Sequence, residues 1–470
     1  MGIFKCLSAC LLVSAALLLN LPPGLCGCYK RIFSFGDSII DTGNFIHMSG
    51  NGSSRYKELP YGMTFFKNAI GRICDGHVLV DFYAQAFQLP MIPPNLPEQD
   101  SGLFPNGANF AVAGATAMPP AYYYRRWNHS VPMPHSLGVQ IGWFKEMLQH
   151  LAPGDDDGAK IRQLLNESLI VLGEIGGNDY NFWFWFGDAT KPREQASRFI
   201  PDIVAYIGSS VQELIGLGAT SILIPSNFPI GCVSSYLSMF PSSDPTDFDG
   251  DRCLRWFNDF STRHNKALRG EVARLKARNP GAKLIYADYY GAAMEFVKNP
   301  GRFGIGNPLV ACCGGGGPYH TGAACERTAK VWGNPSYFAN WDGVHMTEMA
   351  YEVIAQGVFN GGVYSSLSVI GFHPIAESRQ TSTPARPRRR APPSAPAASA
   401  ASAAAFHHRH ANQSRCRTVY LAPPPPSLAP ADGHHPPVIR PRPAGGAPTP
   451  PRPLPAEPPL GRPPPPGPFL

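Results

Sequence analysis

The sequence predicts an α/β fold built on a mainly parallel β-sheet. Four short apolar runs, each bounded by Gly, Pro, Asn or Asp, are typical of buried strands: Arg31–Ser38, Ser168–Leu172, Ser221–Ile224 and Lys283–Asp288. Five segments between and after them carry apolar residues at helical spacing: Val78–Leu89, Val139–Leu151, Phe199–Leu217, Arg252–Arg278 and Met346–Phe359. Strands that alternate with helices favour a parallel sheet, in which ligands bind beyond the carboxyl ends of the strands.

The composition indicates a folded body followed by a chemically different C-terminal segment. The chain has 470 residues, 44% of them hydrophobic and 16% charged, which is enough for a sizeable core in one large or two ordinary domains. The formal net charge is +7, but residues 376–470 alone carry +9, so the body carries −2. A body with this charge has no electrostatic argument for binding nucleic acid.

The N-terminus predicts a secretory signal peptide over residues 1–27. Lys5 supplies the positive region, and Leu7 to Leu19 form an apolar run of 13 residues that ends before Asn20. The run is too short to cross a membrane, and no other stretch reaches the roughly 18 apolar residues that a spanning helix needs. The alternative is a short buried helix.

The other end of the chain, residues 364–470, is predicted to be a disordered tail. From about residue 376 it is rich in Pro, Ala and Arg, with 26 of the chain's 51 prolines and few apolar residues to offset the entropy of ordering. One interpretation is an arm that binds the cell wall or a partner. The other is a dispensable extension.

A secreted chain is expected to form disulfides. Cleavage before Cys28 leaves eight cysteines, and an oxidising compartment favours their pairing. The pairs favoured by proximity are Cys232 with Cys253, and Cys325 with either Cys312 or Cys313. Because CxxC-type spacing is absent, no metal site is expected. Three Asn-x-Ser sequons in the body of the chain are typical of a secreted glycoprotein: Asn51, Asn128 and Asn166.

The first candidate for chemistry is Gly36-Asp37-Ser38, at the end of the first predicted strand. A serine at this edge of the sheet has its hydroxyl free to act as a nucleophile. Alone, the motif is also an ordinary turn or helix-capping sequence.

Two small-residue segments are candidates for binding an oxyanion. Gly176-Gly177-Asn178 follows the second strand, where the glycines permit a sharp turn and the Asn amide offers two N–H donors. Gly107–Ala115 is a loop able to bring a backbone N–H against a substrate oxygen. The alternatives are an Asn that closes a Gly-rich turn and a segment packed tightly on the sheet.

A fourth motif, Asp342-Gly343-Val344-His345, precedes the last predicted helix. A catalytic triad needs a base that takes the serine proton and a carboxylate that orients and stabilises the imidazolium. The Asp-x-x-His spacing lets one loop present both groups. The alternative is a capping Asp beside a surface His.

In this order on an α/β frame, the four motifs resemble the plant GDSL-type esterase/lipase family of the SGNH hydrolase superfamily. The similarity covers roughly Arg31 to Gly362 and includes further stretches: Pro60-Tyr61-Gly62, Asp81-Phe82, Phe228–Cys232, Cys312–Gly315 and Asn340–Thr347. It implies that residues 28–363 form a three-layer α/β/α, flavodoxin-like domain with a five-stranded sheet. It also implies an extracellular protein of the plant cell wall or apoplast.

The resemblance assigns a role to each candidate residue. Ser38 is similar to the family's nucleophile, His345 to its general base and acid, and Asp342 to the partner of that histidine. The oxyanion hole implied by the family consists of the Ser38 N–H, the Gly114 N–H and the Asn178 side chain. Asp37 is interpreted as structural, because Asp342 already supplies the triad carboxylate. No cofactor is implied.

The chain departs from the family pattern in two places. Gly71-Arg72-Ile73-Cys74-Asp75-Gly76 has Cys74 where the family usually has Ser. Family members also usually end soon after the last helix, so the long tail inherits no support from the resemblance.

The predicted activity is serine-dependent hydrolysis of carboxylic esters through an acyl-enzyme. Small acetyl-type or phenolic esters of metabolites or wall polysaccharides are the expected substrates, and aromatic clusters at 121–127 and 182–186 either line their cleft or pack in the core. A transacylase or a long-chain lipase on the same triad is the enzymatic alternative. A secreted carbohydrate-binding glycoprotein without catalysis is the non-enzymatic one, and the intact triad speaks against it.

Overall fold

The computed structural model describes residues 29–359 except 51, 53, 96–103, 128–130, 132 and 187–191. The predicted signal peptide, the tail, Cys28, Cys416 and the sequons at Asn51 and Asn128 lie outside the described residues.

At the centre is a four-stranded parallel sheet in the order β1-β2-β3-β4. Its strands are β1 (Arg31–Ser34), β2 (Ser168–Val171), β3 (Ser221–Pro225) and β4 (Lys283–Ala287). All four predicted strands are therefore confirmed.

The sheet differs from the prediction at the β1 edge. Residues 106–112 occupy the fifth position there: the Ser34 N–H donates to the Ala108 carbonyl at 3.1 Å, and the Phe110 N–H to the Ser34 carbonyl at 2.7 Å. They form only isolated bridges through Asn109 and are not a regular fifth strand. A reason is Gly107, whose φ of 101° interrupts the extended backbone.

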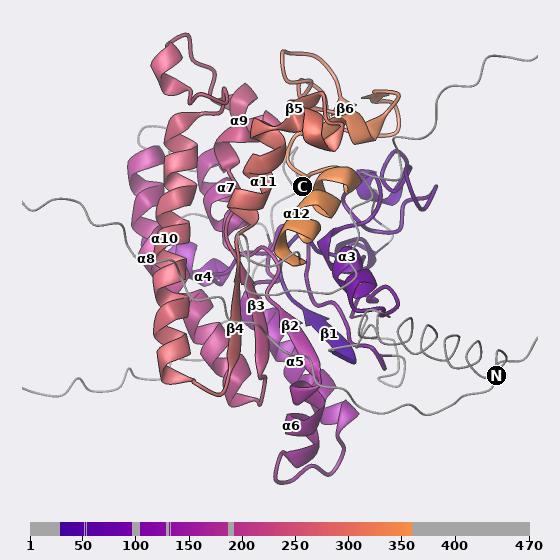
Figure 1. The fold of residues 1–470 in the computed structure, drawn as a ribbon, viewed down its shortest axis with the longest axis vertical. Helices are drawn as coiled ribbons and strands as arrows, with labels where there is room; N and C mark the ends of the chain where they lie inside the picture. The colour runs from indigo at the N-terminus through magenta and orange to yellow at the C-terminus, as the bar shows by residue number, and fades with distance from the viewer. Residues whose placement is uncertain are drawn as a thin grey trace, which may run out of the picture.

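Helices surround the sheet in two groups. One group contains α5 (Leu137–Leu151), α7 (Gly177–Phe186), α8 (Pro192–Gly216) and α10 (Arg255–Arg278). The other contains α3 (Leu79–Ala86), α11 (Tyr289–Lys298) and α12 (Glu348–Phe359). Figure 1 shows α8 beside α10, away from α3 and α12. The connection that follows β1 leads to the edge segment 106–112, and the later connections lead the opposite way across the sheet. Because such connections are right-handed as a rule, the two groups cover opposite faces, which gives the three layers that were expected.

The predicted helices are confirmed: four of them shift by at most three residues at their ends, and α8 begins at Pro192, seven residues before the predicted Phe199. The helix predicted from Met346 starts at Glu348, because the Thr347 hydroxyl accepts the Ala350 N–H at 3.3 Å and caps α12. The Asp288 side chain caps α11 in the same way through the Gly291 N–H. On α10, the buried positions recur along one side of a helix whose other side is exposed.

Shorter elements complete the fold. The remaining helices are α2 (Asn44–Met48), α4 (Pro120–Trp127), α6 (Ala159–Asn166) and α9 (Ser234–Met239). Two small sheets lie near the C-terminal end of the described chain. One pairs β5 (Asn307–Ala311) with β8 (Phe338–Asn340), and the other pairs β6 (Cys313–Gly314) with β7 (Lys330–Val331).

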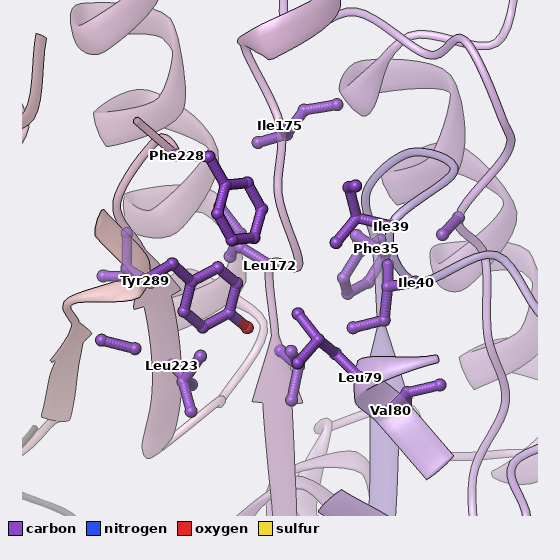
Figure 2. Packing of buried hydrophobic residues seen from close by; sticks show 14 of the residues in the cluster. Phe35, Ile39, Ile40, Leu79, Val80, Leu172, Ile175, Leu223, Phe228 and Tyr289 are labelled. Atoms are coloured by element: carbon purple, nitrogen blue, oxygen red, sulfur yellow. The ribbon is translucent and has the colours of Figure 1, made fainter. Parts of the chain in front are cut away.

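The main core lies between the sheet and its helices. Figure 2 shows Ile39 and Ile40, from the turn after β1, near Leu79 and Val80 of α3. All four are buried. This packing holds the turn that follows β1, and hence Ser38, against the helix layer.

Candidate active site

Ser38 lies in a tight turn at the carboxyl end of β1. The strand was predicted to run to Ser38 but ends at Ser34, because Gly36 has a φ of 138° and turns the chain out of the sheet. A Cβ at Gly36 would lie 2.8 Å from the Glu174 carbonyl oxygen, so only glycine fits. Gln140 clamps the turn, accepting the Gly36 N–H and donating to the Gly36 carbonyl, both at 2.8 Å.

The structure brings Ser38, His345 and Asp342 together. His345 Nε2 lies 2.8 Å from Ser38 Oγ, and His345 Nδ1 lies 2.8 Å from Asp342 Oδ2. The Ser38 and His345 residues are 8% and 4% exposed. Ser38 and His345 are 307 positions apart in the chain. This hydrogen-bond chain has the order that nucleophilic catalysis by serine requires.

Asp342 is held as a carboxylate. Burial alone would raise its pKa, but the adjacent His345, through its charge and hydrogen bonds, and the Val344 N–H lower the pKa to about 2. The Val344 and His345 N–H groups donate to Oδ1 at 3.1 and 2.9 Å. The Tyr61 hydroxyl donates to Oδ2 at 2.9 Å.

The loop that carries Asp342 and His345 is fixed from two sides. The Trp341 N–H donates to the His345 carbonyl at 2.7 Å, which closes the loop on itself. The Cys313 N–H donates to the Trp341 carbonyl, and the Ser235 N–H to the Gly343 carbonyl. The motif is therefore a tight loop and not a capping Asp beside a surface His.

Asn178 sits at the start of α7, directly after β2 and its turn. Its Nδ2 atom donates to Asp37 Oδ2 at 2.9 Å and to the Ala115 carbonyl at 3.1 Å. Its Oδ1 atom accepts from Asn181 Nδ2 at 3.2 Å. The side chain thus bridges the Ser38 turn and the glycine loop.

The Gly107–Ala115 loop brings a free backbone donor to the same place. Gly114 has a φ of 81°, and the Ala113 N–H before it donates to Asp41 Oδ2 at 2.9 Å. Within the described part of the chain, neither the Ser38 N–H nor the Gly114 N–H donates to another protein group. An unpaired N–H on the serine and another on the loop that Asn178 contacts through the Ala115 carbonyl are the kind of donors that an oxyanion hole needs.

Three polar residues of the site were missed as contributors by the sequence analysis. Tyr61 lies in the Pro60-Tyr61-Gly62 stretch, which carried the resemblance but had no role. Asp41 follows the Ser38 motif and accepts four backbone N–H groups, those of Gly43, Asn44, Phe45 and Ala113. Glu174 is buried beside Asp37. The only sequence signal for these three residues was that each is polar and lies within or close to a stretch that had already been selected.

The cysteine predictions can be compared directly with the structure. Cys232–Cys253 and Cys313–Cys325 are disulfides, which confirms the first pair and selects Cys313 for the second. Cys74 is buried and unpaired, with Sγ 3.4 Å from Asp75 Oδ1. The substitution of Cys for Ser at this position is therefore accommodated in the core without a disulfide.

The aromatic cluster at 182–186 belongs mostly to the core. Phe182, Trp183 and Phe184 are at most 7% exposed, and Phe184 packs on Phe257 and Phe260 of α10. In the 121–127 segment, the Tyr122 hydroxyl donates to Asp202 at 2.6 Å, and Tyr123 is buried with its hydroxyl on Asp179. Packing, rather than a cleft, therefore explains most of these rings.

The described residues contain no group of three or more His, Cys, Asp or Glu side chains placed to hold a metal ion. The same residues form no helix with the length and apolar character needed to cross a membrane.

Comparison with protein families matches residues 32–358 to the model of GDSL-like lipases and acylhydrolases. The chain belongs to this family. A GDSL esterase/lipase of Arabidopsis thaliana is 41% identical over 345 residues, covering 72% of this chain and 85% of the relative. A sinapine esterase of Brassica napus is 40% identical over 342 residues, covering 72% and 86%. The protein is thus a plant-type GDSL carboxylic ester hydrolase.

Among solved structures, an acetyl-xylooligosaccharide esterase from Geobacillus covers 70% of this chain and 91% of its own, with 13% identity and a TM-score of 0.31. That likeness is too low to bear on the substrate of this GDSL hydrolase.

Proposed function

We propose that this GDSL hydrolase is secreted and cleaves short acyl or phenolic esters through an acyl-enzyme on Ser38. The observation that carries the proposal is the continuous hydrogen-bond chain from Ser38 Oγ through His345 to Asp342, with both contacts at 2.8 Å. Serine, imidazole and carboxylate in this order are sufficient for acyl transfer without a cofactor.

The first half of the reaction forms the acyl-enzyme. Ser38 Oγ attacks the ester carbonyl carbon while His345 Nε2 takes the hydroxyl proton, and Asp342 stabilises the imidazolium that results. The carbonyl oxygen becomes an oxyanion beside the Ser38 and Gly114 N–H groups. The tetrahedral intermediate collapses, the ester C–O bond breaks, and His345 gives its proton to the departing alcohol.

The second half releases the acid. Water attacks the acyl carbon as His345 takes one of its protons, and Ser38 leaves with that proton. Transfer to an alcohol in place of water is the transacylase alternative.

Asn178 is proposed as the third oxyanion donor. Its two amide hydrogens are directed to Asp37 at 2.9 Å and to the Ala115 carbonyl at 3.1 Å. A substrate oxygen is therefore expected to replace the longer contact, to Ala115, while the bond to Asp37 keeps the amide in place. Removal of one such donor typically costs about 2.7–4 kcal/mol in the transition state.

The substrate class is proposed from two observations. A relative at 40% identity carries the name sinapine esterase, which favours phenolic esters as candidates here. The two disulfides suit the oxidising compartment in which metabolite and wall esters are met. N-glycans at Asn51, Asn128 and Asn166 belong to the same proposal, and Asn166 is exposed at the end of α6.

The first test compares hydrolysis of p-nitrophenyl acetate, butyrate and palmitate, and of sinapine, by wild-type protein and Ser38→Ala. We expect the variant to lose turnover by a factor on the order of a million, down to background. Acetate faster than palmitate would support short esters, whereas a palmitate preference would favour the long-chain lipase.

Ser34→Ala is the matched control for this test. Ser34 is buried in β1, and its hydroxyl has no partner among the described residues. This variant should keep the wild-type rate. Equal rates for Ser38→Ala and wild type would remove Ser38 as the nucleophile, and a folded wild type inactive on every ester would favour the carbohydrate-binding glycoprotein.

A further inference from the structure

Glu174 is a buried carboxyl group that the mechanism above does not use. Its residue is 5% exposed, its Oε1 accepts the Gly177 N–H at 3.1 Å, and its side chain is hydrogen-bonded to that of Asp37. Gly177 makes room for it: a Cβ there would lie 2.6 Å from Glu174 Oε2. The Asp37 N–H also donates to the Glu174 carbonyl at 3.2 Å, so the two residues are tied through backbone and side chain.

Two carboxyl groups in contact require a proton between them. In the described chain, no lysine or arginine forms an ion pair with either group. Two buried carboxyl groups that share a hydrogen bond cannot both be ionised near neutral pH. Burial raises the pKa of Asp37 to about 6, and burial together with the charge of Asp37 raises the pKa of Glu174 well above its usual range. The Asp37 side chain accepts the Ile39 N–H at 3.0 Å and Asn178 Nδ2 at 2.9 Å, whereas within the described residues the Glu174 side chain accepts the Gly177 N–H alone. The hydrogen bonds therefore favour Asp37 as the ionised partner and Glu174 as the one that carries the proton.

The location of this proton supports the orientation of Asn178, whose nitrogen also donates to the Ala115 carbonyl. An ionised Asp37 only accepts hydrogen bonds, so the Asn178 amide must turn its nitrogen toward it. Asn181 Nδ2 donates to the oxygen end of the same amide. A proton on Asp37 would turn that carboxyl into a donor, and when a substrate oxygen displaces the Ala115 carbonyl the amide nitrogen would no longer be held at Asp37.

We propose that Glu174 is a positioning residue that acts as a protonated carboxylic acid: it donates to Asp37 and keeps Asp37 an acceptor. Asp37 thereby holds one N–H of Asn178, so that the other is available to the oxyanion formed at Ser38. The inference rests on the proposed function and adds a residue to it. Glu174 does not touch the reacting atoms.

The kinetic test compares Glu174→Gln with Glu174→Ala. The glutamine amide can still donate to Asp37 and accept the Gly177 N–H, so Glu174→Gln should keep kcat on p-nitrophenyl acetate within about threefold of wild type. Glu174→Ala leaves Asp37 without its donor, so kcat should fall about 10- to 100-fold with KM changed less than threefold. Active-site titration and melting temperature correct each rate for the folded fraction.

An infrared measurement tests the proton independently of activity. The wild-type protein at pH 7 should show a C=O stretch of a protonated carboxylic acid that is missing from Glu174→Gln. Glu167→Gln is the matched control, because Glu167 forms an ion pair with Lys30 outside this pair of carboxyl groups, so its loss should leave the band unchanged. Other buried acids contribute equally to all three proteins and cancel in the difference spectra.

The outcomes separate this inference from the proposed function. Activity that depends on Ser38 but is unaffected by Glu174→Ala would overturn the inference alone. So would a Glu174→Gln variant as slow as Glu174→Ala, or one with the wild-type infrared band. A wild-type protein as slow as Ser38→Ala would overturn the proposed function and, with it, this role of Glu174.

Discussion

Tyr61→Phe is expected to slow catalysis without disturbing the fold. The Tyr61 hydroxyl donates to Asp342 Oδ2 at 2.9 Å, the same oxygen that accepts His345 Nδ1. The ring is fully buried and packs edge-to-face on Trp341 at 6.2 Å. Phenylalanine keeps this ring and removes only the hydroxyl, so the variant tests one hydrogen bond to the triad carboxylate.

The size of the effect follows from the surroundings of Asp342. A hydrogen bond to a charged group contributes about 1.5–3 kcal/mol. Three other donors remain on this carboxylate: His345 Nδ1, the His345 N–H and the Val344 N–H. Removal of the Tyr61 hydroxyl should therefore cost about 1.5 kcal/mol, the low end of this range. If the whole cost falls on the transition state, kcat should fall about tenfold.

The assay is steady-state hydrolysis of p-nitrophenyl acetate, with kcat and KM resolved. Tyr83→Phe is the matched control, because Tyr83 is equally buried but its hydroxyl meets Tyr289 in the core, away from the triad. We expect both variants to lose some thermal stability and only Tyr61→Phe to lose kcat. Equal kcat values for the two variants would refute the view that Tyr61 supports the triad.

Lowering the pH from 7 to 5 should reduce kcat/KM, because protonated His345 cannot accept the Ser38 proton; a flat profile on p-nitrophenyl acetate would contradict this. The same change should raise the melting temperature. Burial raises the pKa of three aspartates to about 6: Asp37, Asp41 and Asp179. Because the folded protein binds these three protons more tightly than the unfolded chain, their contribution to the free energy of unfolding is fully present below about pH 4. It is lost as the pH rises through about 6. Burial also lowers the pKa of His264 to about 4, which opposes the gain below about pH 6.5, while the raised pKa of Glu174 adds to it. The net gain in unfolding free energy should be about 2 kcal/mol or more, and a lower melting temperature at pH 5 would disprove it. Gly107→Ala should lower the free energy of unfolding by roughly 3 kcal/mol or more, because its Cβ would lie 1.9 Å from the Ile32 carbonyl oxygen. The control Gly154→Ala is also at positive φ but in open space, and should lower it by about 1 kcal/mol. Similar melting temperatures for the two variants would show that the close approach at Gly107 is unimportant.

The regular elements were predictable because their patterns are local. Each strand of the main sheet is a short apolar run bounded by turn residues, and each long helix carries a continuous apolar side. The segment 106–112 lacked such a pattern. It lies beside β1 through backbone hydrogen bonds and the close approach of Gly107, and neither leaves a periodic signal in the sequence. That is why the expected regular fifth strand is an irregular edge.

The sequence predicted those site residues that lie in short recognisable motifs, and missed those that join the site through long-range contacts. Ser38, Asn178, Asp342 and His345 were each chosen from short motifs, and the structure brings them together. Tyr61 meets Asp342 across 281 positions of sequence, a contact that no local spacing reveals. The role proposed for Glu174 depends on which of two buried acids holds a proton, which is a property of their packing.

The proposed active site combines two separate regions: the oxyanion donors at the edge of the main sheet, and the loop that carries Asp342 and His345. Ser38 follows β1, Asn178 follows β2, and Gly114 follows the segment on the other side of β1, so adjacent positions in the sheet bring the three proposed oxyanion donors together. His345 and Asp342 come instead from a loop near the C-terminal end of the described chain, tied by the Trp341 carbonyl to Cys313 and its disulfide with Cys325. Only the bond between Ser38 Oγ and His345 Nε2 joins nucleophile to base. A small shift of that loop would separate the base from the nucleophile while the oxyanion donors stay in place. Tyr61, which ties Asp342 to the segment after β1, is therefore expected to help keep the base in register with Ser38.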